Sequence, residues 1–357
     1  MVVPLQHFAS RVVSWQSHSG RHDLPWQNTR DPYRVWLSEV MLQQTQVATV
    51  LTYFTRFLAR LPTVSALAAA PLDEVMGLWS GLGYYSRARN LHQCAKEVVQ
   101  RHGGSFPSEA AALQMLPGIG RSTAAAIASL CFGERVAILD ANVKRVVTRV
   151  LAFADDLAVQ ANERKLWIAA DELLPRTAFR ETMPRYTQGM MDLGATVCLA
   201  RRPLCGKCPV ADVCQARQRG TPEQFPVKTR TLRRSAHSVW LLWAHGRDGT
   251  VWLQRRAVPG VWAGLYCMPW FDSREAMLEV IPDSHKVAIE DLAPFKHVLT
   301  HKDLYLHPVR VVLPKMSLRR AAGQWFTADQ WPALGLPAPV RQILSAQACS
   351  QPNEVEG

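Results

Sequence analysis

The segment Cys198-Leu-Ala-Arg-Arg-Pro-Leu-Cys205-Gly-Lys-Cys208-Pro-Val-Ala-Asp-Val-Cys214 decides how the rest of the chain is interpreted. It places four of the chain's eight cysteines in the spacing C-x6-C-x2-C-x5-C. Four thiolates can hold a tetrahedral zinc ion or a [4Fe-4S] cluster, so the spacing predicts a metal site without naming the metal. The alternative is two disulfides in a small knuckle, which require an oxidising compartment.

The N-terminus and the hydropathy of the chain argue against export. The opening residues MVVPLQHFASRVVSWQ have no cationic start followed by a long apolar run, and no other window is apolar enough to span a bilayer. We therefore expect a cytoplasmic protein with no membrane contact, in which clustered cysteines bind metal rather than each other.

Length and charge define the broad class. A chain of 357 residues with 48% hydrophobic content is long enough for two domains with separate cores. The net charge of +12 predicts a polyanionic partner, and nucleic acid fits better than a membrane because the chain has no membrane signal.

The spacing of apolar residues changes along the chain. Residues 1–216 carry apolar side chains at helical spacing and predict an all-α region. Residues 217–235 lose that periodicity and read as a basic linker. Short strands and one helix near residues 273–280 predict an α+β domain over 236–345, and 346–357 read as a flexible tail.

Two glycines join helical stretches in the segment Leu116-Pro-Gly-Ile-Gly-Arg-Ser-Thr. Gly118 and Gly120 permit backbone conformations that direct successive N–H groups outward, where they can hold a DNA phosphate beside a helix N-terminus. The segment therefore predicts a helix-hairpin-helix backbone anchor. For an isolated Gly-x-Gly, an ordinary glycine-capped turn is the simpler interpretation.

Two acidic residues stand out beside apolar segments. Glu39 has Val35, Trp36, Leu42 and Gln43 as its helical neighbours, so desolvation is expected to raise its pKa and suit it to donate a proton. Asp140 follows the apolar run Val136–Leu139 and precedes a new helix. Taken alone, Glu39 is a surface glutamate and Asp140 a helix N-cap.

Together these segments resemble the helix-hairpin-helix DNA glycosylases of the endonuclease III superfamily, and within it the adenine DNA glycosylases of the MutY type. The resemblance covers nearly the whole chain. It is carried by Asp23–Trp26, Ser38–Thr45, Gly81–Asn90, Leu116–Gly120, Asp140 with Asn142, Tyr186–Ala195, the four cysteines, and Gly260–Cys267, which looks like the family's Nudix-like domain.

The resemblance implies a DNA N-glycosylase that flips adenine out of duplex DNA, where it is mispaired with 8-oxoguanine or guanine, and hydrolyses its glycosidic bond. In the family pattern Glu39 protonates adenine, Asp140 stabilises the oxocarbenium-like sugar and Asn142 orients the site. The resemblance also implies one [4Fe-4S] cluster on Cys198, Cys205, Cys208 and Cys214. We expect a monomer that also interacts with other repair or replication proteins.

Further residues take roles from the same resemblance. Gln44 and Thr45 would fill the gap in the duplex, and Tyr85 would wedge into the stack beside 8-oxoguanine. Thr300 and His301 would read the opposite base. The remaining expected DNA contacts are Gly118, Gly120, Ser122, Lys144 and Gln188, and the expected adenine pocket consists of Leu24, Trp26 and Gln27.

Two rival functions follow from the same motifs. A bifunctional glycosylase with lyase activity uses a lysine where this chain has Ser122, and serine cannot form an imine. A non-catalytic DNA-binding iron-sulfur protein would not need both Glu39 and Asp140.

The chain also departs from the family pattern. Gln27 replaces an arginine, Ala141 replaces a glycine, and Leu299-Thr300-His301 replaces Phe-Ser-His. The second domain carries no Nudix hydrolase box, so no catalytic magnesium is expected there.

Overall fold

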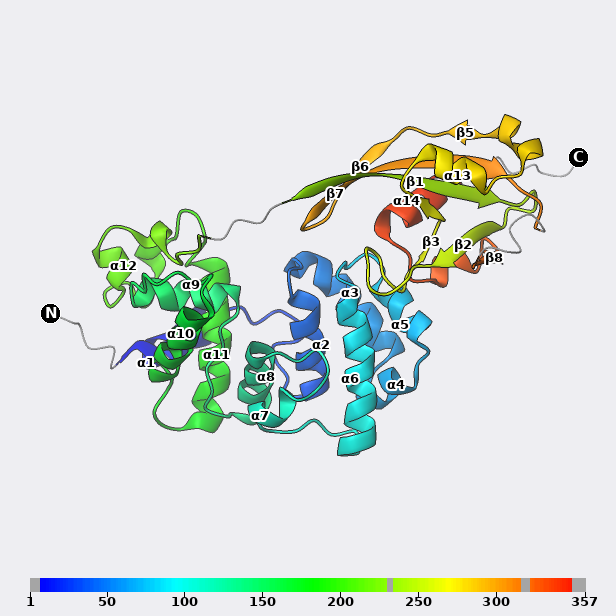
Figure 1. Cartoon of the computed structure of the whole chain (residues 1–357). Coiled ribbons are helices and arrows are strands. Elements are labelled where there is room, and N and C mark those ends of the chain that lie inside the picture. Colours follow the sequence, from blue (N-terminus) through cyan, green and yellow to red (C-terminus); the bar gives the residue numbers. More distant parts are fainter. Residues whose placement is uncertain (1–6, 230–233, 316–321, 349–357) are drawn as a thin grey trace, which may run out of the picture. The chain divides into compact units, whose positions relative to one another are not determined.

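The computed structural model describes residues 7–229, 234–315 and 322–348 (Figure 1). The chain divides into two compact units, one formed by residues 1–68 and 93–231 and the other by 69–92 and 232–357. Residues 69–92, expected within the helical region 1–216, thus belong to the second unit. Residues 230–233 of the expected linker and 349–357 of the expected tail lie outside the described residues.

The first unit is helical, which confirms the prediction for this part of the chain. The described helices that lie wholly or mostly in it are α1 (Phe8–Ser19), α2 (Pro32–Leu42), α3 (Val47–Arg60), α4 (Val64–Ala69), α6 (Ser86–His102), α7 (Ala110–Leu113), α8 (Arg121–Ile127), α9 (Ala141–Val150), α10 (Gln160–Glu172), α11 (Phe179–Thr196) and α12 (Gln215–Gln218). A π-helical turn, Ala128–Phe132, continues α8.

Local capping and apolar stripes explain these helices. Helix α2 begins where the Asp31 side chain accepts a hydrogen bond from the Tyr33 amide at 2.9 Å, with Pro32 in the first turn. Helices α1, α9, α10 and α11 bury one core that includes Phe8, Val146 and Leu166. The cysteine segment packs against the same core through Cys198, Cys208 and Cys214, so the metal site and α9 share one packed body.

The second unit is a mixed sheet with a few helices, as expected for an α+β domain. Its strands are β1 (Ser235–His245), β2 (Val251–Arg255), β3 (Tyr266–Cys267), β4 (Trp270–Phe271), β5 (Glu290–Asp291), β6 (Phe295–Val298), β7 (Lys302–Val312) and β8 (Gln324–Phe326). The main path runs β3-β2-β1-β7-β5, with β1 and β7 parallel and the other pairs antiparallel. Helices α13 (Arg274–Glu279) and α14 (Ala338–Ala348) accompany the sheet (Figure 1).

Close packing explains why α5 (Leu72–Trp79) belongs to the second unit. A Cβ on Gly335 would lie 2.7 Å from the Cβ of Met76, and one on Gly77 would lie 2.2 Å from the Ala333 carbonyl oxygen. Only glycine permits both approaches. Ser80 adds a hydrogen bond from its hydroxyl to the Leu336 carbonyl oxygen at 2.8 Å. No helix among the described residues is long and apolar enough to cross a membrane.

Candidate active site

Glu39 lies on α2, one turn before the helix ends, and its side chain is partly buried. Burial and, to a smaller extent, the nearby negative charge of Asp140 raise the pKa of its carboxyl to about 7. The two carboxyls, expected to act together, are therefore close enough to influence each other. At neutral pH a large fraction of Glu39 carries a proton that it can donate.

Asp140 is the N-cap of α9, as its position in the sequence suggests. Its Oδ1 accepts a hydrogen bond from the Val143 amide at 2.7 Å. Burial raises the pKa of Asp140, while hydrogen bonds from the Val143 and Asn142 amides and the charges of Arg145 and Lys144 act in the opposite direction. Backbone amides and nearby positive charges thus stabilise the Asp140 carboxylate, whereas burial and the charge of Asp140 both raise the pKa of Glu39.

Asn142 sits two residues into α9 and contacts α11 closely. A Cβ on Gly194 would lie 2.6 Å from the Cβ of Asn142, so only glycine allows this helix crossing. Arg145 holds the arrangement, because its Nη2 donates to Asn142 Oδ1 at 2.9 Å and to the Gly194 carbonyl at 2.7 Å. Its Nε donates to the Cys198 carbonyl at 2.8 Å. Sequence reasoning missed Arg145, although its i+3 spacing from Asn142 on a helix was available as a signal.

The glycine hairpin precedes α8. Gly118 has φ +76°, a left-handed conformation that favours glycine, and Gly120 is the N-cap residue whose carbonyl accepts from the Ala124 amide at 2.9 Å. Both glycines are exposed. The Ser122 hydroxyl accepts a hydrogen bond from the Leu139 amide at 3.1 Å, which ties the hairpin to the strand-like approach to Asp140.

The other expected DNA contacts of the first unit are spread over separate elements. Gln44 follows the end of α2, is exposed and has φ +57°. Thr45 is partly buried, and its hydroxyl donates to the Gln43 carbonyl at 3.4 Å. Lys144, on the exposed side of α9, forms an ion pair with Glu163.

Two of the three expected adenine-pocket residues, Trp26 and Gln27, lie with Gln188 around one cavity, whereas Leu24 is not among its lining residues. Trp26 is 7% exposed and packs edge-on against Phe54, and Leu24 is also buried. Trp26, Gln27 and Gln188 line a cavity of about 440 Å³, whereas Glu39 and Asp140 are not among its lining residues. Val35, one helical turn before Glu39 on α2, does line it.

Gln27 carries a buried donor at this cavity. Its Oε1 accepts from the Leu24 amide at 3.4 Å, while its Nε2 is buried without a hydrogen-bond partner among the described residues. An unsatisfied buried amide is costly, so its position suggests that a ligand supplies the missing acceptor. The Gln188 amide instead donates to Asp192 Oδ1 at 2.9 Å.

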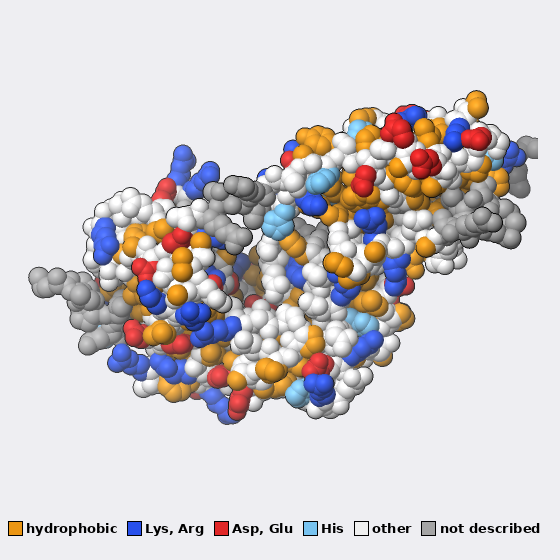
Figure 2. Space-filling view, in the orientation of Figure 1, with side chains coloured by type: hydrophobic (Ala, Val, Ile, Leu, Met, Phe, Trp, Pro, Cys, Tyr) orange, Lys and Arg blue, Asp and Glu red, His pale blue; other side chains and the backbone are white. Residues whose placement is uncertain are grey.

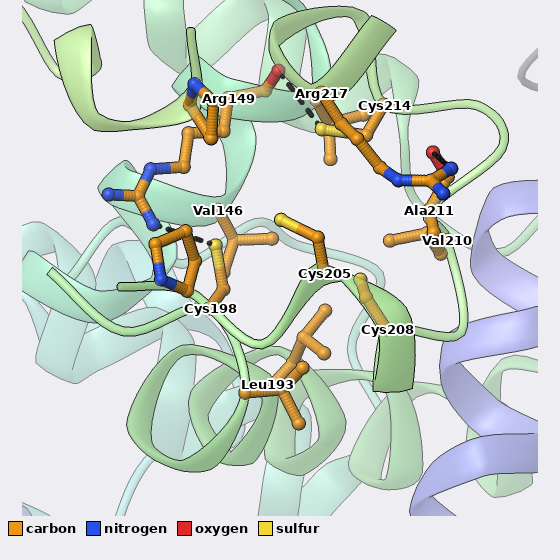
Figure 3. A pocket seen from close by; sticks show the side chains of 14 residues that line it. Val146, Arg149, Leu193, Cys198, Cys205, Cys208, Val210, Ala211, Cys214 and Arg217 are labelled. Carbon is orange, nitrogen blue, oxygen red and sulfur yellow. Dashed lines mark hydrogen bonds between the residues drawn. The ribbon is translucent and has the colours of Figure 1, made fainter. Parts of the chain in front are cut away.

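The four cysteines surround one small pocket beneath α9 (Figure 3). Four thiols that line one common pocket provide a complete ligand set for a metal centre, and an iron-sulfur cluster fits that set. When bound, an iron-sulfur cluster cross-links the four thiolates and can exchange electrons.

Arg149 supplies a buried positive charge next to the thiols and is only 2% exposed. Its Nη1 donates to Cys198 Sγ at 3.3 Å and to the Leu199 carbonyl at 2.6 Å, and the Cys214 thiol donates to the Arg149 carbonyl at 3.4 Å (Figure 3). A guanidinium beside several thiolates offsets their negative charge, which the site needs because the ligands bind as anions.

A second cleft lies within the second unit. It has a volume of about 590 Å³ and is lined by Tyr84, Tyr85, Trp262, Thr300 and His301 among others. Thr300 and His301 are exposed at the tip of the β6–β7 hairpin. The Tyr84 hydroxyl shares a hydrogen bond with the Thr300 hydroxyl.

The two tyrosines of this cleft differ in environment. The Tyr85 hydroxyl donates to the Leu336 carbonyl at 3.2 Å and accepts from the Gly81 amide at 3.2 Å, and its ring is partly buried. The Tyr84 ring is 40% exposed, and its backbone has φ +44°. Tyr85 as a wedge stays a prediction. Sequence reasoning missed Tyr84, for which the tandem tyrosines after Gly83 were the available signal.

Surface charge alone does not locate a DNA interface. Figure 2 shows Lys and Arg side chains scattered over the visible face of the first unit rather than gathered in one stripe. The positions of the hairpin, the carboxyls and the clefts are therefore the better guide to where DNA binds.

Three family models match separate parts of the chain. Residues 37–170 match the HhH-GPD superfamily base excision DNA repair proteins, and residues 198–214 match the iron-sulfur binding domain of endonuclease III. Residues 239–346 match the NUDIX domain. The chain therefore carries one iron-sulfur cluster.

Named relatives cover most of the chain. An adenine DNA glycosylase from Buchnera aphidicola subsp. Baizongia pistaciae is 35% identical over 347 residues, which are 95% of this chain and 96% of the relative. The human adenine DNA glycosylase is 45% identical over 233 residues, which are 63% of this chain and 42% of the relative.

Solved structures resemble the helical part. A thermostable thymine-DNA glycosylase is 28% identical with a TM-score of 0.53, covering 60% of this chain and 97% of its own. Endonuclease III in a non-covalent DNA complex is 22% identical with a TM-score of 0.50, covering 61% and 98%, and supports the fold alone. On the full-length similarity to its relatives, the chain belongs to the adenine DNA glycosylases, DNA N-glycosylases of base excision repair that remove adenine.

Proposed function

We propose that the enzyme acts on adenine opposite 8-oxoguanine or guanine in duplex DNA and releases it by hydrolysis, without cutting the strand. The observation that carries the proposal is the pair of neighbouring carboxyls: Glu39, whose pKa is raised to about 7, and Asp140, held by backbone amides at the start of α9. This pair can divide acid and stabilising roles as glycosidase carboxyls do.

The reaction starts once adenine has left the duplex stack, because neither carboxyl can reach it there. Glu39 donates its proton to the adenine ring as the glycosidic bond breaks, and the bonding electron pair leaves with the base. The Asp140 carboxylate stabilises the positive charge on the sugar, directly or through a covalent intermediate. Water then supplies the hydroxyl at the sugar carbon and loses a proton. Asn142, fixed by Arg145, orients these groups.

The base itself is proposed to be held by the cavity around Trp26, Gln27 and Gln188. The buried Nε2 of Gln27 gains its missing partner if it donates to an adenine ring nitrogen. Glutamine thereby replaces the arginine of the common family pattern as a donor, while Leu24 and Trp26 provide apolar walls. A donor of this kind discriminates strongly against ligands without a matching acceptor.

Phosphate contacts are assigned to exposed backbone and basic groups of the first unit. Gly118 and Gly120 are exposed immediately before α8, and Lys144 lies near Asp140. Gln44 and Thr45 are proposed to occupy the gap left by the flipped base. These contacts fix the position of the duplex and carry little sequence information.

Strand cleavage is expected to be absent. Ser122 stands at the position where a lyase carries its Schiff-base lysine, and its hydroxyl already accepts from the Leu139 amide. The Lys144 ammonium forms an ion pair with Glu163.

The opposite base is proposed to meet the cleft formed by Tyr84, Tyr85, Thr300 and His301. Its hydroxyls and imidazole can hydrogen-bond to the atoms that distinguish 8-oxoguanine from guanine, and the exposed ring of Tyr84 can stack on a base. The enzyme is proposed to work as a monomer.

One experiment tests the function. Duplexes with adenine opposite 8-oxoguanine, guanine or thymine are incubated with the protein, and free adenine is measured separately from alkali-independent nicks. We expect release in the order 8-oxoguanine, guanine, thymine, with no nicking above the background. Nicking at the rate of base release would favour the lyase alternative, and equal release from all three duplexes would refute the mispair specificity.

A further inference from the structure

The connection between α5 and α6 has a strained backbone. Gly81 and Gly83 have φ +105° and +69°, and Tyr84 follows with φ +44°. A left-handed conformation is unfavourable for a side-chain-bearing residue and persists only where the surroundings enforce it. The contacts that enforce it here can be identified among the described residues.

Arg87 is the centre of those contacts. It is 9% exposed, and its guanidinium lies 5.4 Å from the ring centroid of Trp79 and 5.3 Å from that of Tyr84. Its Nη2 donates to the carbonyls of Leu82 and Gly83, at 3.1 and 3.4 Å. Burial lowers the pKa of Arg87 to about 10, so the group stays charged at neutral pH.

Trp79 completes this set of contacts from inside the second unit. Its side chain is fully buried, and its Nε1 donates to the same Gly83 carbonyl at 3.1 Å. The Gly83 carbonyl thus accepts from both Trp79 and Arg87, immediately before the left-handed Tyr84. Two donors on one carbonyl fix the orientation of the peptide that joins Gly83 to Tyr84.

The contacts of Trp79 and Arg87 with the Gly83 carbonyl fix the position of Tyr84. With the peptide fixed, the Tyr84 ring stands out from the loop, and its hydroxyl meets Thr300 at the tip of the β6–β7 hairpin. Both residues line the cleft of about 590 Å³. The chain of contacts from Trp79 through Arg87 to Tyr84 therefore ends at the surface that the proposed function assigns to the opposite base.

We propose that Arg87 is a positioning residue for opposite-base recognition: together with Trp79 it holds Tyr84 in its left-handed conformation beside Thr300, and it thereby sets the preference for 8-oxoguanine over guanine. The inference rests on the proposed function of the cleft. Lysine cannot replace Arg87, because it lacks the planar group that lies between two rings while donating to two carbonyls.

The test compares discrimination with stability. Arg87→Lys and Trp79→Phe are made in the full-length protein and in a Tyr84→Ala background, with Arg101→Lys on α6 as a matched exposed control. Single-turnover release of adenine is measured opposite 8-oxoguanine and opposite guanine at one salt concentration, together with Tm. Trp79→Phe keeps a smaller buried ring and removes the indole donor, so it provides a second variant if Arg87→Lys folds poorly.

We expect each variant to lower the ratio of the rate opposite 8-oxoguanine to the rate opposite guanine by at least ~3-fold. In the Tyr84→Ala background, each variant should leave this ratio within ~2-fold of the value for Tyr84→Ala alone, because residues that act through one another are not additive. A lower Tm with an unchanged ratio would reduce Arg87 to a purely structural role and overturn the inference. A full effect that persists without Tyr84 would also overturn it. If Tyr84→Ala alone leaves the ratio unchanged, the proposed role of the cleft fails, and the inference fails with it.

Discussion

Replacing Glu39 with glutamine should make the stability of the protein less dependent on pH. The carboxyl has a pKa of about 7 in the folded enzyme, against an ordinary value of 4.5 for a glutamate exposed to water. Between these two values the folded state binds a proton that the unfolded state releases, so folding stability from this group falls as pH rises from 4.5 to 7. Glutamine does not titrate and removes this dependence.

The size of the effect follows from the same two values. Linkage with pKa values of 4.5 and about 7 gives a loss of about 2 to 3 kcal/mol between pH 5 and pH 8. Wild-type protein should therefore lose about 2 to 3 kcal/mol more stability than Glu39→Gln over that interval. The variant becomes the relatively more stable protein above pH 7, while it no longer releases adenine.

Denaturant unfolding at pH 5, 6, 7 and 8 measures the difference directly, provided that both proteins unfold in one transition. Glu109→Gln, at an exposed position, controls for the loss of a carboxylate in general. Stability curves for wild type and Glu39→Gln that run parallel across this range would refute the raised pKa. In wild-type enzyme the same pKa predicts that single-turnover release falls towards tenfold per pH unit above about 7, because the proton donor is lost.

Three further predictions concern single features of the site. Asp140→Asn should slow adenine release by at least ~100-fold with little change in duplex affinity or Tm, because asparagine caps a helix as well as aspartate does; a loss of tenfold or less would contradict the assigned role. Gln27→Leu, which keeps the size of the side chain and removes the buried amide, should lower kcat/KM by roughly tenfold, the value of one hydrogen bond, and unchanged kinetics would argue against adenine contact. Purified protein should contain iron and acid-labile sulfide, and removal of the cluster should weaken DNA binding in a gel-shift assay more than it slows release from bound duplex; zinc without iron would contradict the assignment.

The sequence was most informative where function depends on local pattern. The cysteine spacing, the apolar neighbours of Glu39 and the position of Asp140 before a helix are all short-range signals, and the structure gives Glu39 the raised pKa and Asp140 the capping bond that they predict. Helical periodicity likewise predicted α2 and α9.

Long-range packing was beyond the same reasoning. Residues 69–92 look helical, as the rest of the first half does, but their partners Ala333, Leu334 and Leu336 lie more than 200 residues further along the chain. No periodicity reports such a pairing. Which of Tyr84 and Tyr85 exposes its ring depends on the left-handed backbone conformation of Tyr84. The sequence does not show this conformation.

The return of residues 69–92 to the second unit has a consequence for biosynthesis. Helix α5 leaves the ribosome about 250 residues before Trp331–Ala333 and α14 complete its surroundings. At ~5–20 residues per second, translation leaves the buried faces of Met76 and Trp79 without their final neighbours for roughly 12–50 s. During that interval the nascent chain carries an apolar segment whose final partners have not been made, and chaperones that bind exposed apolar segments would bind there.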